Sequence, residues 1–333
     1  MSTSCGARSR YEWIDVMKGI SILLVVVGHL MIPQWLYKYI YSFHLYVFFF
    51  CAGITFRYKK ELGTAKYIQK CVRTLIFPYF LFAVLRSSMN IGSRLLHGGE
   101  VDVMMICDTI CEIALGTGGG NVIGPAWFLL ALLWTRIFFH ILVALQLRHI
   151  TICVISVLVY VIGVYAGNNT LNLFKIMSAS TCVIFYYLGY ILKTLFASYD
   201  GKNCGVYFCV CAGVSLYLSS FEAFPLNLIT NTIPATPVLN FACGLLGCLS
   251  VFYLSFLILK QSGALLKVVL LMGVNSLVVM GTHIEIKVVL SYILNRFFDP
   301  SYYMSLALLL CIIIFSVPIC ALYRKYVASL IGK

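Results

Sequence analysis

Ten long apolar runs dominate this chain of 333 residues. A helix that crosses a bilayer needs about 20 consecutive apolar residues, and most of the runs approach that length. The connecting segments are short, so little chain is left for a second domain. The sequence therefore predicts an all-α polytopic integral membrane protein, with about ten transmembrane helices in a single domain over residues 1–333. The runs cover residues 16–36, 39–56, 74–92, 126–147, 150–167, 177–195, 204–220, 238–259, 268–290 and 302–323.

The composition excludes other classes. Hydrophobic residues make up 62% of the chain and charged residues only 11%, whereas a soluble domain has about 45–50% apolar and about 25% charged residues. The net charge of +13 follows mainly from membrane topology. With a cytoplasmic N-terminus, sixteen of the 24 Lys and Arg residues lie on the cytoplasmic side, four lie outside, and four lie within or near the spans, which is a strong positive-inside bias. We therefore expect both termini to be cytoplasmic and no nucleic-acid partner.

Three ionisable residues lie within the first apolar run or directly before it, although a charge at bilayer depth costs at least about 2.5–3.5 kcal/mol. At 100° per residue, Lys18 lies within about 20° of His29, and Asp15 within about 40°, so the three share one stripe. The small residues Gly19 and Gly28 allow a neighbouring helix or a ligand to approach closely. The structural alternative is an interfacial Asp15–Lys18 pair and a His29 that bonds a neighbouring helix. Three ionisable groups on one stripe favour a functional site.

Three more side chains are candidates for the same region. His44 lies near the outer end of the second run and can face His29 across a short hairpin; Trp127 opens the fourth run. Both are also typical of an interfacial aromatic belt. His283 lies in the ninth run, where Glu285 is expected on the far side of the helix. A His and a Glu in one span cost more than packing alone justifies.

A basic segment follows the second run. Six cations occur within residues 57–73. Lys70 and Arg73 are three residues apart, so they share a helix face at the membrane surface and suit a phosphorylated cytosolic ligand such as a nucleotide or coenzyme A. The alternative is plain positive-inside retention with binding of lipid head groups. Pro78 is expected to stop or kink this helix, and the acidic segment 101–115 is too short to span.

Taken in order, five pieces of the sequence resemble the acyltransferase family 3 membrane proteins, which are bacterial O-acetyltransferases acting on sugars and cell-surface glycans. The resemblance runs from about residue 10 to 290. It implies a ten-helix core in the inner (plasma) membrane that moves an acetyl or other short acyl group from cytosolic acetyl-CoA to a hydroxyl group. The pieces read DVMKGISILLVVVGH, SFHLYVFFFCAG, KCVRTLIFPYF, GPAWFLLALL and NSLVVMGTH.

The resemblance also implies roles for individual residues. His29 matches a histidine required in the family and would act as general base or as covalent acyl carrier. Lys18 stands eleven residues earlier, where the family has an arginine, and Asp15 completes the catalytic group. Lys70-x-x-Arg73 replaces an Arg-x-x-Arg motif and would hold the donor phosphates. Each lysine keeps the charge but loses a fork-shaped donor.

The acceptor side completes the hypothesis. His44, Trp127 and His283 are expected to contact a sugar or lipid-linked glycan, with membrane lipid as the other partner. We expect no metal, because neither C-x-x-C nor H-E-x-x-H occurs. The main rival is a secondary transporter or flippase for a glycan-related substrate, with the intramembrane charges as its path. Transporters often show paired halves, and no internal repeat is visible here. Turnover of acyl-CoA separates the two hypotheses.

Overall fold

The computed structural model describes residues 5–167, 172–299 and 301–327. Within these ranges the regular secondary structure is helical, apart from one isolated β-bridge between Asn227 and Thr232. The all-α prediction is confirmed, while the predicted cytoplasmic C-terminus at Lys333 lies outside the described residues. The helices are α1 (Cys5–Gly28), α2 (Gln34–Tyr41), α3 (Tyr46–Thr55), η1 (Lys60–Leu62), α4 (Thr64–Leu96), α5 (Val103–Leu115), η2 (Gly124–Ala126), α6 (Trp127–Ala144), α7 (His149–Gly167), η3 (Leu173–Lys175), α8 (Ile176–Ala197), α9 (Cys204–Ser219), α10 (Pro237–Leu259), α11 (Ala264–Val274), α12 (Ser276–Leu294) and α13 (Tyr302–Tyr326).

Seven helices in the described part of the chain are long and apolar enough to cross a membrane, so the expected count of ten is not confirmed. The seven lie in α4, α6, α7, α8, α10, α12 and α13. The other runs take different forms. The helix α1 is long enough but carries Glu12, Asp15 and Lys18. The second run is divided between the short helices α2 and α3, and α9 has only 16 residues.

Two runs that we expected to form continuous helices are interrupted. The first helix ends at Gly28, and Pro33 precedes α2. Pro33 disfavours the helical conformation at Ile32, so one continuous helix over 16–36 is disfavoured at that position. The run 268–290 breaks at Asn275, which separates α11 from α12. The side chain of Asn275 donates to the carbonyl of Leu271 at 2.7 Å. Such local bonds compete with helical pairing and explain the break.

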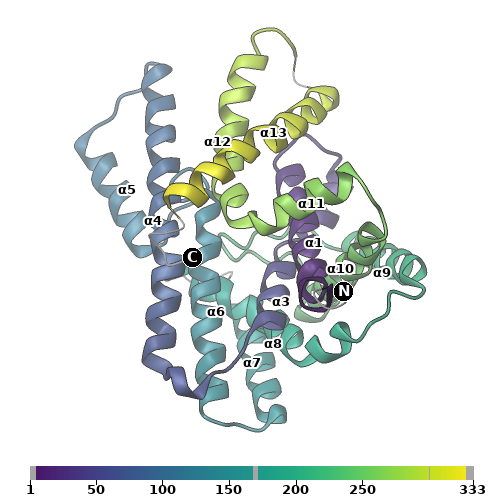
Figure 1. Ribbon diagram of the computed structural model, residues 1–333. Helices are drawn as coiled ribbons and strands as arrows, with labels where there is room; N and C mark the ends of the chain where they lie inside the picture. The colour runs from purple at the N-terminus through teal and green to yellow at the C-terminus, as the bar shows by residue number, and fades with distance from the viewer. Residues whose placement is uncertain (1–4, 168–171, 300, 328–333) are drawn as a thin grey trace.

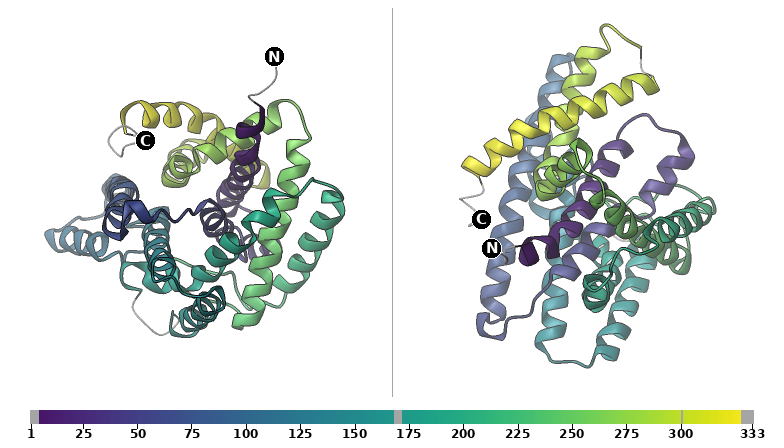
Figure 2. Two further views of the ribbon diagram at one scale, coloured as in Figure 1. Left: turned by 60° about the horizontal axis from the view of Figure 1, so that its bottom comes forward. Right: turned by 45° about the vertical axis from the view of Figure 1, so that its right-hand side comes forward.

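The first helix occupies the centre of the molecule. It contacts α2, α3, α10, α11 and α12, and Figures 1 and 2 show it surrounded by the other helices. Its closest neighbour is α11, because Gly19 lies against the backbone carbonyl of Val269 and Gly273 lies against that of Asp15. A Cβ atom at either glycine would collide with backbone. The predicted close approach of a helix at Gly19 is therefore confirmed.

The longest helix, α4, stands along one side of the molecule (Figure 1). It runs through Pro78 without stopping, so of the two expected effects, a stop or a kink, the stop is wrong. With 33 residues it is about 50 Å long at 1.5 Å per residue, which exceeds the roughly 30 Å hydrocarbon core. Beyond its end, α5 is short as predicted, and Asp102 caps it by accepting from the Met105 amide at 2.7 Å.

Candidate active site

A cavity of about 450 Å³ lies beyond the end of α1. We call it the histidine cavity, because His29 and His44 both line it, with Trp127 and the rings of Tyr37 and Tyr41. The two histidines that we expected to face each other across the hairpin thus line the same cavity. The remaining lining comes from α1, the connection between α2 and α3, the loops before α6 and α10, α6 and α12. It consists of Val25, Leu45, Gly120, Gly124, Pro125, Phe128, residues 225–229, Met280 and Ile284.

Contacts with neighbouring groups fix the position and the tautomer of the histidine rings. The ring of His283 lies 5.1 Å from that of His29, centroid to centroid, although His283 is fully buried and does not line the cavity. Its Nδ1 contacts the Val279 carbonyl at 2.9 Å. A carbonyl only accepts, so Nδ1 is the donor and Nε2 of the neutral ring carries a lone pair. His44 is fixed in the same way by the Ile40 carbonyl at 2.7 Å.

A second cavity of about 350 Å³ contains three cations. We call it the cationic cavity; Lys18, Lys70 and Arg136 line it together with Thr74 and Ser276. The structure thus brings together two of the predicted cations from α1 and α4, and adds a third from α6. No carboxylate lines this cavity among the described residues, so it attracts an anionic group.

The remaining predicted residues lie around this cavity. Asp15 accepts a hydrogen bond from Lys18 at 3.5 Å, which is the pair that the structural alternative describes. Arg73 is exposed on α4 and lines neither cavity. Lys70 and Arg73 therefore share a helix but not the cavity. The guanidinium of Arg136 lies 6.0 Å from the centre of the Tyr67 ring, a cation–π contact.

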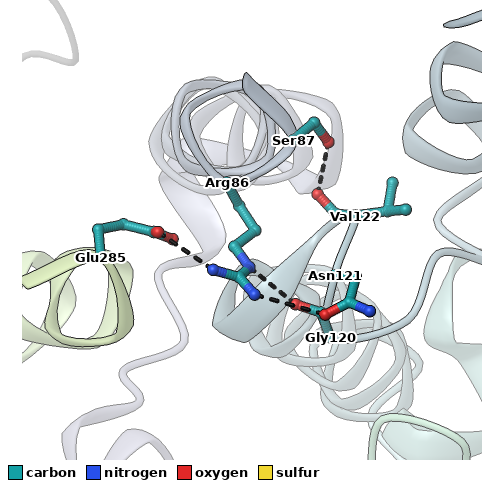
Figure 3. Close-up of polar contacts among 6 residues, drawn as sticks. All are labelled: Arg86, Ser87, Gly120, Asn121, Val122 and Glu285. Carbon is teal, nitrogen blue, oxygen red and sulfur yellow. Dashed lines mark hydrogen bonds and ion pairs between the residues drawn. The ribbon is translucent and has the colours of Figure 1, made fainter. Parts of the chain in front are cut away.

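An ion pair across the membrane helices holds one wall of the histidine cavity (Figure 3). Arg86 of α4 contacts the Glu285 carboxylate of α12 at 3.2 Å, and its other nitrogens donate to the Gly120 carbonyl at 2.9 Å and the Asn121 side chain at 3.5 Å. Both charged side chains are largely buried, with exposed fractions of 12% and 8%. We call this arrangement the arginine clamp, because it fixes the loop that carries Gly120 and Gly124.

A second buried cation holds the same loop from the other side. The ammonium group of Lys175 donates to the Ile229 carbonyl at 2.9 Å, and to those of Gly118 at 3.3 Å and Thr117 at 3.5 Å. Its side chain is only 2% exposed. Lys175 therefore connects the glycine-rich loop before α6 to the loop before α10. Both loops contribute to the lining of the histidine cavity.

Sequence reasoning missed three cations in this region. The sequence indicates Arg86 and Arg136 only as two of the four charges within or near the spans, and Lys175 only as one of the four cations on the outer side. The cost of burying a charge was the one signal in the sequence that pointed to a role for these cations, because a charge within the membrane needs a partner. The partners come from segments far apart in the chain, which helical periodicity does not reveal. Glu285, expected on the far side of its helix, faces Arg86.

The fold, with its seven helices long and apolar enough to span a membrane, and the two cavities indicate a multi-pass membrane protein with a histidine site and a cationic site. Residues 11–325 match the family model described as an acyltransferase domain. The chain therefore belongs to acyltransferase family 3 and is a membrane acyltransferase. Comparison with curated proteins and with solved structures gave no match. Within the described ranges, no group of three or more His, Cys, Asp or Glu residues is placed to hold a metal ion.

Proposed function

We propose that this protein transfers an acetyl or other short acyl group from cytosolic acyl-CoA to a hydroxyl group of a sugar or cell-surface glycan precursor. The observation that carries the proposal is the pair of cavities. One holds cations without a lining carboxylate and suits the phosphates of coenzyme A. The other holds histidines among aromatic rings, and flat aromatic side chains offer an apolar surface for the faces of a sugar ring.

In the proposed reaction, His29 takes the proton of the acceptor hydroxyl as its oxygen attacks the thioester carbonyl carbon. The carbon–sulfur bond breaks, the new ester leaves with the acyl group, and the proton passes from His29 to the coenzyme A sulfur. His283 keeps the His29 ring in place through its packing and its fixed tautomer. Covalent transfer through an acyl-His29 uses the same geometry, with the imidazole attacking first.

The donor is proposed to lie in the cationic cavity. Lys18 and Lys70 hold its phosphates from two helices, and Asp15 keeps Lys18 in position through their 3.5 Å contact. Arg73 is proposed to contact a phosphate that projects outside the cavity. His44 and Trp127, which line the histidine cavity, are proposed to orient the acceptor, so that donor and acceptor enter from different sides.

The direct test is His29→Ala in purified, detergent-solubilised protein given acetyl-CoA labelled in the acetyl group. Release of free coenzyme A and transfer of label to a panel of simple sugars are both measured. We expect a loss of at least 100-fold in turnover, which is typical of a removed general base, with unchanged insertion. The control is His97→Ala, because His97 is exposed and remote from both cavities. Near-normal turnover by His29→Ala contradicts the proposal.

Membrane orientation is part of the proposal, since the donor is cytosolic. The basic segment 57–73 should lie on the cytoplasmic side of a bacterial plasma membrane, and the acidic segment near residue 100 should lie on the opposite side. The length of α4, about 50 Å, exceeds the thickness of the hydrocarbon core and supports this arrangement, with one end of the helix on each side of the bilayer. Single cysteines at Glu61 and Glu100, in a background without the 14 native cysteines, report this. An impermeant thiol reagent on intact cells should label only position 100.

A further inference from the structure

The histidine cavity and the cationic cavity share a wall. Among the residues that the structure describes, two side chains line both cavities, Phe128 of α6 and Met280 of α12. Both are buried, with exposed fractions of 5% and 4%. The two cavities are therefore separated at this point by a single layer of side chains.

The wall lies on the path that an acyl group would follow. Lys18 and His29 belong to the same chain segment and are eleven residues apart, which corresponds to about 16 Å along a helix. A donor held by its phosphates near Lys18 reaches His29 only if its uncharged thioester arm passes the wall. Both wall residues are apolar, so the wall admits an acyl chain more readily than water or an ion.

The two halves of the wall differ in mobility. The ring of Phe128 is held edge-on by Phe48 at 5.6 Å and by Phe49 at 5.1 Å, between ring centroids. A phenylalanine packed in this way has little room to move. Met280 is unbranched, with three rotatable side-chain bonds, and adapts to gaps of different shape. Met280 is therefore the half that can move aside.

We propose that Phe128 and Met280 form an acyl gate, which selects the length of the acyl group and limits its passage from the cationic cavity to His29. The inference rests on the proposed function, because it assumes an acyl-CoA donor. The gate adds no chemical step: the thioester is cleaved beyond it, at His29. Acetyl fits past Met280 with a rotamer change, and each further methylene must find space against the fixed Phe128 ring.

The test compares purified wild type with Met280→Ala across acetyl-, propionyl-, butyryl- and hexanoyl-CoA, following release of free coenzyme A with water as the acceptor. One methylene in an apolar pocket changes kcat/KM by about 10-fold or more. We expect Met280→Ala to raise the butyryl-to-acetyl ratio of kcat/KM at least 10-fold. Phe128→Leu opens the wall from the other side and should shift the ratio in the same direction.

The matched control is Met272→Ala. Met272 is also buried, at 1% exposed, and lines neither cavity, so it reports the effect of losing a core methionine elsewhere. The gate would be overturned if Met280→Ala and Met272→Ala shifted the ratio equally. It would also be overturned if neither Met280→Ala nor Phe128→Leu shifted the ratio. Both outcomes leave the acyltransferase proposal intact. Failure of the wild type to bind or cleave any acyl-CoA would overturn the proposed donor, and the gate with it.

Discussion

The arginine clamp predicts a large coupling energy between Arg86 and Glu285. Arg86→Met leaves the Glu285 carboxylate buried without its partner, since only 8% of that side chain is exposed. Removing one member of a buried ion pair costs about 3–5 kcal/mol. Losing the bond to the Gly120 carbonyl adds about 1 kcal/mol. Glu285→Leu should cost less, because Arg86 keeps its two acceptors in the loop.

The double variant Arg86→Met/Glu285→Leu removes both charges and should be more stable than Arg86→Met alone. We expect a coupling energy of about 2–3 kcal/mol, measured by reversible unfolding in mixed micelles with a denaturing detergent. The control cycle uses Lys202 and Asp200, an ion pair of 2.9 Å whose side chains are 84% and 54% exposed. It should show no measurable coupling, because water and salt screen exposed charges. Additive effects at Arg86 and Glu285 would refute the clamp.

Three other predictions follow from the same structure. Lys70→Met should raise KM for acyl-CoA more than Arg73→Met does, because of these two residues only Lys70 lines the cationic cavity. Steady-state kinetics of both variants measure this, and equal increases in KM would contradict the prediction. Lys175→Met should raise KM for the acceptor and leave KM for acyl-CoA unchanged, because it releases the two loops beside the histidine cavity. An unchanged KM for the acceptor would refute the proposal that Lys175 holds these loops in place for acceptor binding. In the loop between α9 and α10, burial raises the pKa of Glu222 from 4.5 to about 7. The folded state therefore favours the protonated form, so this stability is complete below about pH 4.5 and is lost as the pH rises to about 7. Thermal unfolding of wild type and Glu222→Gln should diverge over that interval, and parallel curves would exclude the effect.

Much of the architecture could be predicted because its signals are local. Apolar runs mark helices whatever they pack against, and the positions of Asp15 and Lys18 on one helix follow from their spacing. The structure pairs Asp15 with Lys18, while His29 lies one residue beyond the end of α1 and shares a cavity with His44. The family resemblance, confirmed over residues 11–325, added the expectation of acyl transfer.

The rest of the site depends on contacts between distant segments. Arg86 and Glu285 are 199 residues apart, and Lys175 holds a loop more than 50 residues away. Such pairings leave no periodic signal in a single sequence. The wall of Phe128 and Met280 is equally hidden, because each residue is an ordinary apolar member of its own helix. Only the packed structure shows that both border the two cavities.

The interrupted helices explain why the cavities lie where they do. Backbone that is not helical is tolerated at membrane depth only where protein or a cavity receives its polar groups. His29 lies just beyond the last helical residue of α1 and lines the histidine cavity, while the break at Asn275 falls between Gly273, Val274 and Ser276, which line the cationic cavity. If the helices over 16–36 and 268–290 were continuous, their backbone N–H and C=O groups would bond to one another and leave none free beside either cavity. The departures from regular helix thus occur beside the cavities, where local sequence rules give way to the geometry of the site.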